Sequence, residues 1–333
     1  MRIFVCEYVT GGGLCGQPLP ASLSREGDMM LTALVKDLAS LDGIEVVTTR
    51  DKRLHALRTE ASVSTIDEPG AFWPCWSELI HSADAVWPIA PETGGILSRI
   101  CELAVEAGRR LLASDPQSVR LTSSKLATAR HLSKAGINSV PTAPLRNGVN
   151  FRKASAWVVK PDDGAGAEQT LLFETAGSLD RWIAENPHSH MILQPHVSGP
   201  ATSLSLLCRD GAAWLLTCNE QLVEITGNEF RYRGFIVGGC ESRRTVYQQM
   251  ASAVAAAIPG LWGYVGVDLI EGPDGPVVLE INPRLTTSYA GLRDAVGVNP
   301  AGLVLDLLKR QIPDIQRPLQ VTPQRIDLDL SND

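Results

Sequence analysis

The chain has 333 residues, of which 44% are hydrophobic and 20% are charged, as in an ordinary soluble globular protein with two or three structural units. The formal net charge of −7 argues against a general nucleic-acid-binding protein, which would carry a basic stripe. No apolar run is long enough to span a bilayer, and the N-terminus lacks the layout of a signal peptide.

The seven cysteines are scattered, odd in number and without a CxxC pair. This usage predicts reduced thiols, most of them small core residues, in a cytoplasmic protein. A zinc site is not expected. His188 and His190 give only a weak metal signal, and a polar surface loop is the favoured interpretation of that segment.

Strand and helix patterns alternate over residues 1–113. Strands are predicted at 3–9, 44–49, 85–90 and 110–113, and helices at 24–39 and 94–107. Such alternation predicts a doubly wound parallel sheet with helices on both faces. Because ligands of such sheets sit outside the carboxyl ends of the strands, the loops 7–13 and 88–95 are candidate ligand loops.

The glycine run from Gly11 to Gly13 follows the first predicted strand. It could cradle an anion with backbone N–H groups, and a flexible turn is an equally good interpretation. Because Glu7, Tyr8 and Thr10 precede it, a substrate loop is slightly favoured. The run is not a GxGxxG motif and no helix follows closely, so a dinucleotide site is not expected.

A second unit begins at Ser114-Asp115-Pro116, a strong helix-start signal, and its first helix is predicted to run to about residue 135, where Gly136 ends it. Further strands are predicted at 157–161, 171–173, 191–194, 203–208, 213–218, 235–238, 266–270 and 277–284, and helices at 179–186, 246–257 and 301–310. The tail after residue 311 is predicted to be irregular. The expected domains are 1–113, 114–190, 191–315 and a tail at 316–333.

The two last predicted strands carry the most informative residues. Glu280 and Asn282 lie one strand period apart and project to the same face, and Asp268 lies on the preceding strand. The connection Glu271-Gly272-Pro273-Asp274-Gly275-Pro276 is dense in turn-forming residues, so the strands should pair as a hairpin. Two carboxylates and an amide oxygen suit a hard divalent cation, most often Mg²⁺ on nucleotide phosphates, although a core ribbon with polar ends is the alternative.

Lys160 ends the apolar strand 157–161 and precedes a loop of small residues at 162–167. A lysine at a buried strand end needs an anionic partner, and backbone amides of a glycine-rich loop can approach phosphate oxygens closely. Lys125 by itself is predicted to be a solvated residue in the middle of a helix. The segment 194–200 leaves a strand and turns, which exposes backbone groups able to bind the edge of a planar base.

The order of these features along the chain resembles the ATP-grasp superfamily of carboxylate–amine ligases, in which two α+β subdomains clasp one ATP. The resemblance covers about residues 114–310, and the preceding α/β unit is similar to the pre-ATP-grasp domain. It implies that Lys125 and Lys160 hold the α- and β-phosphates. It further implies that a loop formed by Gly164, Ala165 and Gly166 closes over the phosphates. The implied adenine-binding hinge is formed by Gln194, His196 and Val197.

The resemblance also implies which residues bind the metal and stabilise the reaction intermediate. Asp268, Glu280 and Asn282 are the implied Mg²⁺ ligands, with Mn²⁺ as a substitute, and Arg284 is the implied arginine that stabilises an acyl phosphate. The chain departs from the pattern at Ala201, where many relatives have a glutamate that binds the ribose. Thr202 or Ser203 is expected to substitute for it, or ribose recognition is weaker.

Substrate contacts are expected from residues near the metal strands. Arg233 is the leading candidate to hold a substrate carboxylate, because bidentate pairing favours arginine. Arg231 is assigned a surface role by default. The other candidates for the substrate pocket are Asn219, Gln221, Thr286, Thr287 and Tyr289.

Two short segments, 7–13 and 281–289, resemble the tyramine–glutamate ligase group of methanofuran biosynthesis. This resemblance implies an acid–amine ligase that uses ATP and joins the γ-carboxylate of glutamate to tyramine or tyrosine. The alternatives are an ATP-grasp ligase for another amino acid or peptide, a small-molecule kinase, and a nucleotide-binding regulator without turnover. The expected partners are small molecules, with no nucleic acid and no membrane. A homodimer is allowed, and the sequence leaves the oligomeric state open.

Overall fold

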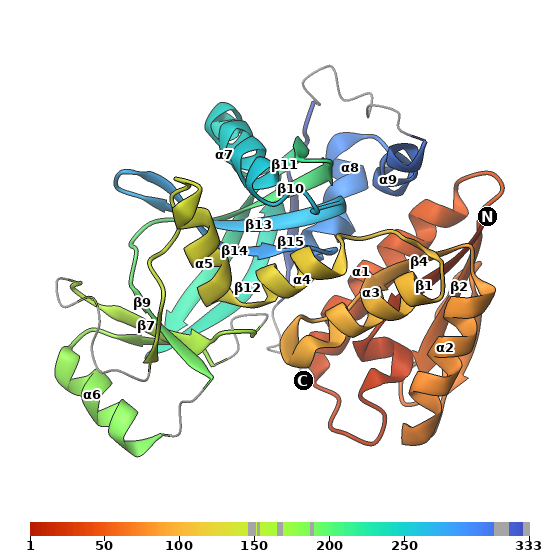
Figure 1. The fold of residues 1–333 in the computed structure, drawn as a ribbon, viewed down its shortest axis with the longest axis horizontal. Helices are drawn as coiled ribbons and strands as arrows, with labels where there is room; N and C mark the ends of the chain where they lie inside the picture. Colours follow the sequence, from red (N-terminus) through yellow and green to blue (C-terminus); the bar gives the residue numbers. More distant parts are fainter. Residues whose placement is uncertain (146–150, 152–153, 165–168, 187–189, 310–319, 329–333) are drawn as a thin grey trace.

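The computed structural model describes residues 1–145, 151, 154–164, 169–186, 190–309 and 320–328. Within these residues the chain forms two β-sheets, one in each half, with helices packed against both (Figure 1). No helix in the described residues is long and apolar enough to cross a membrane.

The N-terminal half holds a five-stranded parallel sheet with the order β3-β2-β1-β4-β5. Its elements are β1 (Arg2–Glu7), α1 (Ala21–Ala39), β2 (Glu45–Asp51), β3 (Ser62–Ile66), α2 (Phe72–Ser82), β4 (Ala85–Ile89), α3 (Ile96–Glu106) and β5 (Arg110–Leu111). Ile3 and Val5 belong to the core with α1, whereas Phe4 and Cys6 belong to the core with α2 and α3. Helices therefore cover both faces, and the predicted doubly wound sheet is confirmed.

The C-terminal half holds a ten-stranded sheet with the order β14-β13-β10-β11-β12-β8-β7-β9-β6, and β15 pairs with β12 outside this path. Its strands are β6 (Ala143–Pro144), β7 (Trp157–Pro161), β8 (Leu171–Phe173), β9 (Met191–Pro195), β10 (Ala201–Arg209), β11 (Ala212–Thr226), β12 (Glu229–Val237), β13 (Gly263–Gly272), β14 (Gly275–Asn282) and β15 (Gln324–Asp327). Its helices are α4 (Pro116–Ser123), α5 (Lys125–Lys134), α6 (Ala176–Glu185), α7 (Arg244–Ala257), α8 (Leu292–Val296) and α9 (Pro300–Leu308).

The large sheet packs on both faces. Helix α7 and Leu132 of α5 cover one face. On the other face, α8 and α9 share a single hydrophobic core with α1 of the N-terminal half. Because this core runs through both halves, the carboxyl ends of β1 and β4 are held against the large sheet. The proposed boundaries at 113/114, 190/191 and 315/316 remain predictions.

The structure corrects the helix that was predicted to run from residue 114 to 135. Helix α4 ends at Ser123 and α5 begins at Lys125, because Ser124 has an extended backbone and caps α5 by accepting a hydrogen bond from the Ala127 amide. Lys125 therefore begins a helix instead of lying in the middle of one. Its side chain is only 8% exposed, so the predicted solvated position is also wrong.

Further differences concern individual strands and helices. The first strand ends at Glu7, and the residues Val9–Gly13 form a π-helical turn. The elements β3 and α2 have no counterpart among the predicted ones. The tail is not wholly irregular, because β15 pairs with β12 from Gln324 to Asp327 and adds an edge strand to the large sheet.

Candidate active site

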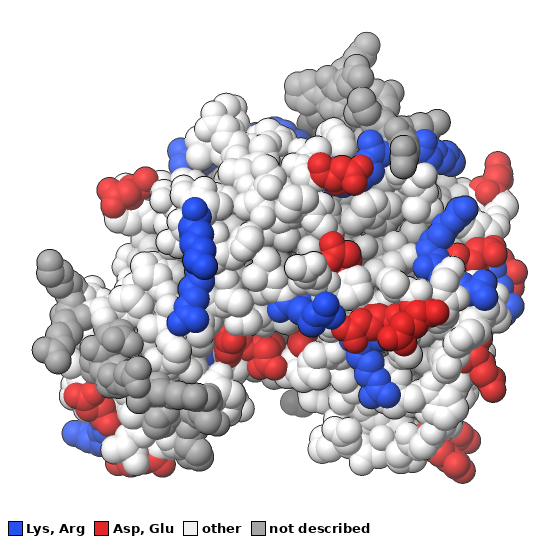
Figure 2. All heavy atoms as spheres, in the orientation of Figure 1, with Lys and Arg blue, Asp and Glu red and all other residues white. Residues whose placement is uncertain are grey.

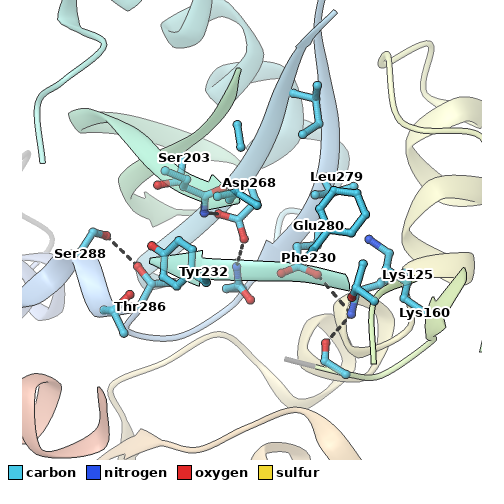
Figure 3. Close-up of a pocket in the computed structure, with 18 of the residues that line it drawn as sticks. Lys125, Lys160, Ser203, Phe230, Tyr232, Asp268, Leu279, Glu280, Thr286 and Ser288 are labelled. Atoms are coloured by element: carbon cyan, nitrogen blue, oxygen red, sulfur yellow. Dashed lines mark hydrogen bonds and ion pairs between the residues drawn. The ribbon is translucent and has the colours of Figure 1, made fainter. Parts of the chain in front are cut away.

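A cavity of about 500 Å³ lies between the two halves. Its walls come from the carboxyl ends of β1 and β4, from α1, from β7 and β9, and from the strands β10 to β14. Figure 3 shows the side chains that these elements direct into the cavity, with Glu280 close to Lys125 and Lys160. Most of the predicted site residues line this cavity.

The hairpin of β13 and β14 brings three oxygen-bearing side chains together. Asp268 lies directly opposite Glu280, and Asn282 lies opposite Gly266. Asn282 Nδ2 donates to Asp268 Oδ2 over 3.0 Å, and Gln221 Nε2 donates to Asp268 Oδ1 over 3.0 Å. The predicted hairpin is thus present, and it gathers the three residues that are predicted to bind the metal.

The two carboxylates repel each other. Desolvation inside the cavity raises the pKa of Asp268 well above its usual range, and the charge of Glu280 raises it further. Desolvation acts on Glu280 in the same direction, but the charges of Lys125 and Lys160 outweigh it and hold the pKa of Glu280 at about 2. A divalent cation would relieve the repulsion, so these oxygen donors fit one.

The protein alone supplies few ligands for such an ion. Within the described part of the chain, no group of three or more His, Cys, Asp or Glu side chains could hold a metal. Mg²⁺ is commonly bound by one or two carboxylates together with substrate phosphates. The site therefore suits a cation that arrives with a phosphate ligand.

Lys125 and Lys160 lie beside Glu280 in the cavity, and Lys160 is only 6% exposed. Lys125 Nζ lies 3.2 Å from Glu280 Oε2 and donates to the carbonyl of Gly164. Burial lowers the pKa of Lys160 to about 8, although the charge of Glu280 opposes this shift. Two buried cations beside one ionised carboxylate leave an excess of positive charge, which suits a polyanion such as a triphosphate.

Arg284 is held by a carboxylate of the N-terminal half. Its Nε and Nη2 donate to Glu92 Oε1 and Oε2 over 2.9 and 2.8 Å, and Nη1 donates to the carbonyl of Leu285 over 3.0 Å. The two side chains are 11% and 8% exposed, respectively. Glu92, which is not among the predicted site residues, fixes the predicted catalytic arginine at the cavity wall.

The start of the predicted phosphate loop is fixed by contacts with α5 and with the segment that precedes α3. Asp162 accepts hydrogen bonds from Ser124 Oγ over 2.6 Å and from the Leu126 amide over 2.8 Å, at the start of α5. Asp163 Oδ2 accepts one from the Gly94 amide over 3.0 Å. Gly164 lines the cavity. The predicted loop residues Ala165 and Gly166 lie outside the described residues.

The other end of the cavity is suited to a planar base. Gln194, His196 and Val197 line it as predicted, with Gln194 Nε2 donating to Thr142 Oγ1 over 2.9 Å. The cavity is also lined by apolar side chains that are not among the predicted site residues: Val140, Val158, Phe230, Ile270 and Leu279. Val158 lies two residues before Lys160 on β7, so strand alternation could have identified it.

Comparison with known proteins agrees with this arrangement. Residues 122–288 match the family of the ATP-grasp domain, and residues 44–119 match the pre ATP-grasp 3 domain. The chain belongs to the ATP-grasp family. The predicted fold, an α/β pre-ATP-grasp domain followed by an ATP-grasp domain, is confirmed.

Individual relatives cover almost the whole chain. Tyramine–L-glutamate ligase from Methanocaldococcus jannaschii is 22% identical, over 98% of this chain and 94% of its own length. The enzyme of the same name from Methanocaldococcus fervens is 25% identical, over 87% and 89%. The crystal structure of an ATP-grasp superfamily protein from Archaeoglobus fulgidus matches with a TM-score of 0.71 at 23% identity, over 99% of this chain and 100% of that one.

These findings confirm the predicted class of enzyme, an ATP-dependent ligase that forms carbon–nitrogen bonds. The ATP-grasp fold also implies binding of ATP together with a divalent metal. In this family context, Lys125 and Lys160 lie beside Glu280 of the β13–β14 hairpin in the cavity of the ATP-grasp domain (Figure 3).

The structure does not bring Arg233 to the cavity of this ATP-grasp protein. Its Nε donates to Glu224 Oε2 over 2.8 Å in a largely exposed pair. On β12, Phe230 and Tyr232 line the cavity, and side chains alternate along a strand, so Arg231 and Arg233 face the other way. Arg233 is therefore in no position to hold a substrate carboxylate there.

The remaining predicted pocket residues divide into two groups. Gln221, Thr286 and Thr287 line the cavity. Asn219 lies behind the wall, where its Nδ2 donates to Ser203 Oγ over 3.3 Å and to Ser205 Oγ over 3.1 Å. Tyr289 is a core residue, because it is 1% exposed and its hydroxyl donates to Asp37 Oδ2 over 2.9 Å. The sequence pattern could not distinguish the residues that line the cavity from those that lie behind its wall or in the core.

Strand alternation distinguishes the two candidates for ribose recognition. Ser203 lines the cavity of the ATP-grasp domain and pairs with Asp268 in the register of β10 and β13. Thr202 points to the opposite face, where its Oγ1 accepts a hydrogen bond from the Tyr247 hydroxyl over 3.4 Å. Of the two, Ser203 is the residue in a position to replace the glutamate that is missing at Ala201.

The glycines of the pre-ATP-grasp loop serve close packing and form no open anion cradle. A Cβ at Gly11 would lie 2.7 Å from Thr49 Oγ1, and a Cβ at Gly12, where φ is +102°, would lie 2.5 Å from the Ile66 side chain. Glu7 and Val9 are the parts of this loop that line the cavity. The loop therefore contributes to the cavity through its side chains.

Proposed function

We propose that this ATP-grasp enzyme joins the γ-carboxylate of glutamate to the primary amine of tyramine or tyrosine, in the biosynthesis of a methanofuran-type cofactor. The observation that carries the proposal is the single cavity in which Lys125 and Lys160 face Asp268 and Glu280, with Arg284 at its wall. The two relatives named tyramine–L-glutamate ligase support this choice of substrates.

Mg²⁺, with Mn²⁺ as a substitute, is the proposed metal. Asp268, Glu280 and Asn282 would hold it, and it would neutralise phosphate charge when bound. The buried lysines would attract the triphosphate, and the apolar end near Phe230 would take the adenine. Gln194, His196 and Val197 are the proposed adenine hinge, Ser203 the ribose contact, and Gly164 to Gly166 the loop over the phosphates.

The proposed reaction has two steps. An oxygen of the glutamate γ-carboxylate attacks the γ-phosphorus, the bond from that phosphorus to the β–γ bridging oxygen breaks, and ADP leaves. The amine nitrogen then attacks the acyl carbon, the carbon–oxygen bond to phosphate breaks, and the nitrogen loses a proton. A free carboxylate is a poor acylating agent, so the phosphate is needed as a leaving group.

The protein contributes position and charge. Lys160 would neutralise charge that develops on the transferred phosphoryl group, and Arg284 would stabilise the acyl phosphate and its transition state. Because an acyl phosphate hydrolyses readily, this reaction needs water to be kept away from the acyl phosphate. The cavity walls would also hold the reactants in the geometry of attack, which would supply much of the remaining rate acceleration.

A product assay tests the proposal directly. The protein is incubated with MgATP, glutamate and a panel of primary amines that includes tyramine and tyrosine. We expect ADP release that depends on both glutamate and an amine, and a γ-amide detected by mass spectrometry. Absence of an amide with every amine would refute this function. A stable phosphorylated product would indicate a kinase instead, and tight MgATP binding without hydrolysis a regulator.

The buried lysine predicts a particular pH dependence. Because the pKa of Lys160 is about 8 in the free protein, this side chain loses its proton, and with it part of its attraction for ATP, as the pH rises above 8. We expect kcat/KM for ATP to fall about tenfold per pH unit above that value. A Lys160→Arg variant should move the fall to higher pH. A flat profile up to pH 9.5 would contradict the assignment.

A further inference from the structure

Behind the cavity wall, the large sheet holds a buried network of four uncharged side chains, which are those of Ser203, Ser205, Asn219 and Tyr264. In the register of the sheet, Asn219 of β11 lies opposite Ser203 of β10, and Ser203 lies opposite Asp268 of β13. Asn219 is 0% exposed, whereas Ser203 lines the cavity. Charged side chains of both signs lie on the face drawn in Figure 2, but this network is neutral and almost fully withdrawn from solvent.

The hydrogen bonds of Asn219 fix the direction of its side-chain amide. The backbone N–H of Gly238 donates to Asn219 Oδ1 over 3.1 Å, so the atom in this position must be the amide oxygen. The amide nitrogen then donates its two hydrogens to Ser203 Oγ over 3.3 Å and to Ser205 Oγ over 3.1 Å. The Tyr264 hydroxyl also donates to Ser205 Oγ, over 3.0 Å. Reversal of the amide would leave the buried N–H of Gly238 unpaired, which is costly.

This direction determines how the Ser203 hydroxyl can act. A hydroxyl has one hydrogen and two lone pairs, and one lone pair of Ser203 accepts from Asn219. Within the part of the chain that the structure describes, the Ser203 hydroxyl donates to no other group, and it lines the cavity. Its hydrogen is therefore available to an acceptor atom in the cavity. An ionised glutamate at the position of Ala201 could only accept, because a carboxylate has no hydrogen to donate.

We propose that Asn219 is a positioning residue that makes Ser203 a hydrogen-bond donor to a ribose hydroxyl oxygen of the bound nucleotide. The proposal rests on the proposed function, in which Ser203 contacts the ribose. The direction of this hydrogen bond is the reverse of the one that a glutamate at residue 201 would make, in which the ribose hydroxyl donates. A nucleotide that lacks this ribose oxygen would leave the hydroxyl hydrogen of Ser203 unpaired in the complex.

Calorimetry tests the proposal by measuring the binding of ADP and of its 2′-deoxy and 3′-deoxy forms, each with Mg²⁺. We expect the wild-type protein to bind one of the two deoxy forms about five- to tenfold more weakly than ADP, because one hydrogen bond between uncharged groups is lost. Ser203→Ala should bind ADP and that deoxy form equally. The ratio of the two dissociation constants is the decisive quantity, because a general loss of packing would weaken the binding of both nucleotides alike.

Asn219→Asp tests the role of Asn219 at nearly unchanged size. A carboxylate there would accept from Ser203 and Ser205, so the Ser203 hydrogen would turn inward and the preference for ADP should fall below about twofold. The added charge by itself would weaken the binding of ADP and of the deoxy form equally. Adding Asn219→Asp to Ser203→Ala should therefore leave the ratio as it is in Ser203→Ala. Thr217→Val is the matched control, because Thr217 lies on the same strand and its buried hydroxyl has no partner within the described residues. It should keep the wild-type ratio.

The outcomes separate this inference from the proposed function, because amide formation is assayed in parallel. Circular dichroism spectra show which variants fold, and Asn219→Leu, which has neither donor nor charge, should also lower the preference for ADP. A preference that depends on Ser203 and Asn219, without any amide product, would support this inference and refute the ligase reaction. Amide formation without a preference for ADP over either deoxy form, or with one that Ser203→Ala or the folded Asn219 variants leave unchanged, would overturn this inference and leave the ligase reaction standing.

Discussion

Replacing Glu280 with Gln is expected to lower kcat for amide formation by about a thousandfold, because a charged ligand of the proposed metal is lost at the place where phosphate charge develops. Glu280 also supplies the anion that Lys125 approaches to 3.2 Å. The variant should therefore be less stable without nucleotide, since removing one partner of an enclosed ion pair leaves an uncompensated charge. MgATP should restore part of that stability, because its phosphates supply a replacement anion.

The measurement is the steady-state rate over a range of Mg²⁺ and Mn²⁺ concentrations, together with melting temperatures with and without nucleotide. Glu224→Gln is the matched control, because it removes a carboxylate from the same sheet that pairs with Arg233 outside the cavity. It should keep the wild-type rate and metal dependence. If Glu280→Gln keeps more than a tenth of the activity with an unchanged metal dependence, Glu280 is no metal ligand.

The hairpin that carries Glu280 could be predicted because its signals are local. The alternation of residues and the turn sequence lie within about 20 residues, and the observed pairing of Asp268 with Glu280 follows from them. One feature of the same hairpin could not be predicted. The register shifts between Asp268 and Leu269, so that Leu279 is the extra residue of a bulge in β14, and Leu279 and Glu280 both reach the cavity.

The elements missed in the N-terminal half gave weak signals for physical reasons. Strand β3 lies at the sheet edge and buries only Ile66, so its sequence does not show the alternation of a half-buried strand. Helix α2 contains Pro74, which argues against a helix in a sequence pattern but is tolerated in the first turn, where no intrahelical donor is needed. The hydrophobic core that β3 and α2 share with β1, β4 and α3 forms only when these distant segments pack together, so it leaves no local sequence pattern.

The site residues that sequence reasoning misplaced depended on side-chain direction. Arg233 was chosen for its chemistry, yet the face of β12 that meets the cavity carries Phe230 and Tyr232. Lys125 was assigned to the middle of a helix because the break at Ser124 is a single extended residue within an otherwise helical pattern. The position of the Arg233 side chain depends on which face of β12 it occupies, and that of Lys125 depends on the helix break at Ser124. Neither is visible from the residue type.

Glu92 is the strongest example of a contact that no local pattern could reveal, because it pairs with Arg284 across 192 residues of sequence. Its two oxygens accept from Nε and Nη2 of the arginine, which fixes the plane of the guanidinium. Glu92 also belongs to the loop whose Thr93 hydroxyl and Gly94 amide donate to Asp163 over 3.0 Å each. This loop of the N-terminal half therefore holds both the proposed catalytic arginine and the start of the phosphate loop.

Glu92→Gln is consequently expected to lower kcat by about 10- to 100-fold while KM for ATP changes less than threefold, because the variant loosens Arg284 without touching the lysines that are proposed to bind phosphate. Breaking this enclosed pair should also cost about 3 kcal/mol of stability. Glu102→Gln is the matched control, because Glu102 of α3 pairs with Arg120 of α4 in an exposed bridge that also joins the two halves. It should leave both kinetic constants and the melting temperature near the wild-type values.

The two kinetic constants and the melting temperature together distinguish three roles for Glu92. A fall in kcat with an unchanged KM, rescued in part by Glu92→Asp, identifies a residue that positions Arg284. A lower melting temperature with full activity would mean that the pair only joins the two halves, and a rise in kcat would mean that Glu92 restrains an arginine that must move to act. Because the ion pair is nearly withdrawn from water, with both side chains about a tenth exposed, salt should weaken it little. The kcat difference between wild type and Glu92→Gln should thus persist in 0.5 M salt.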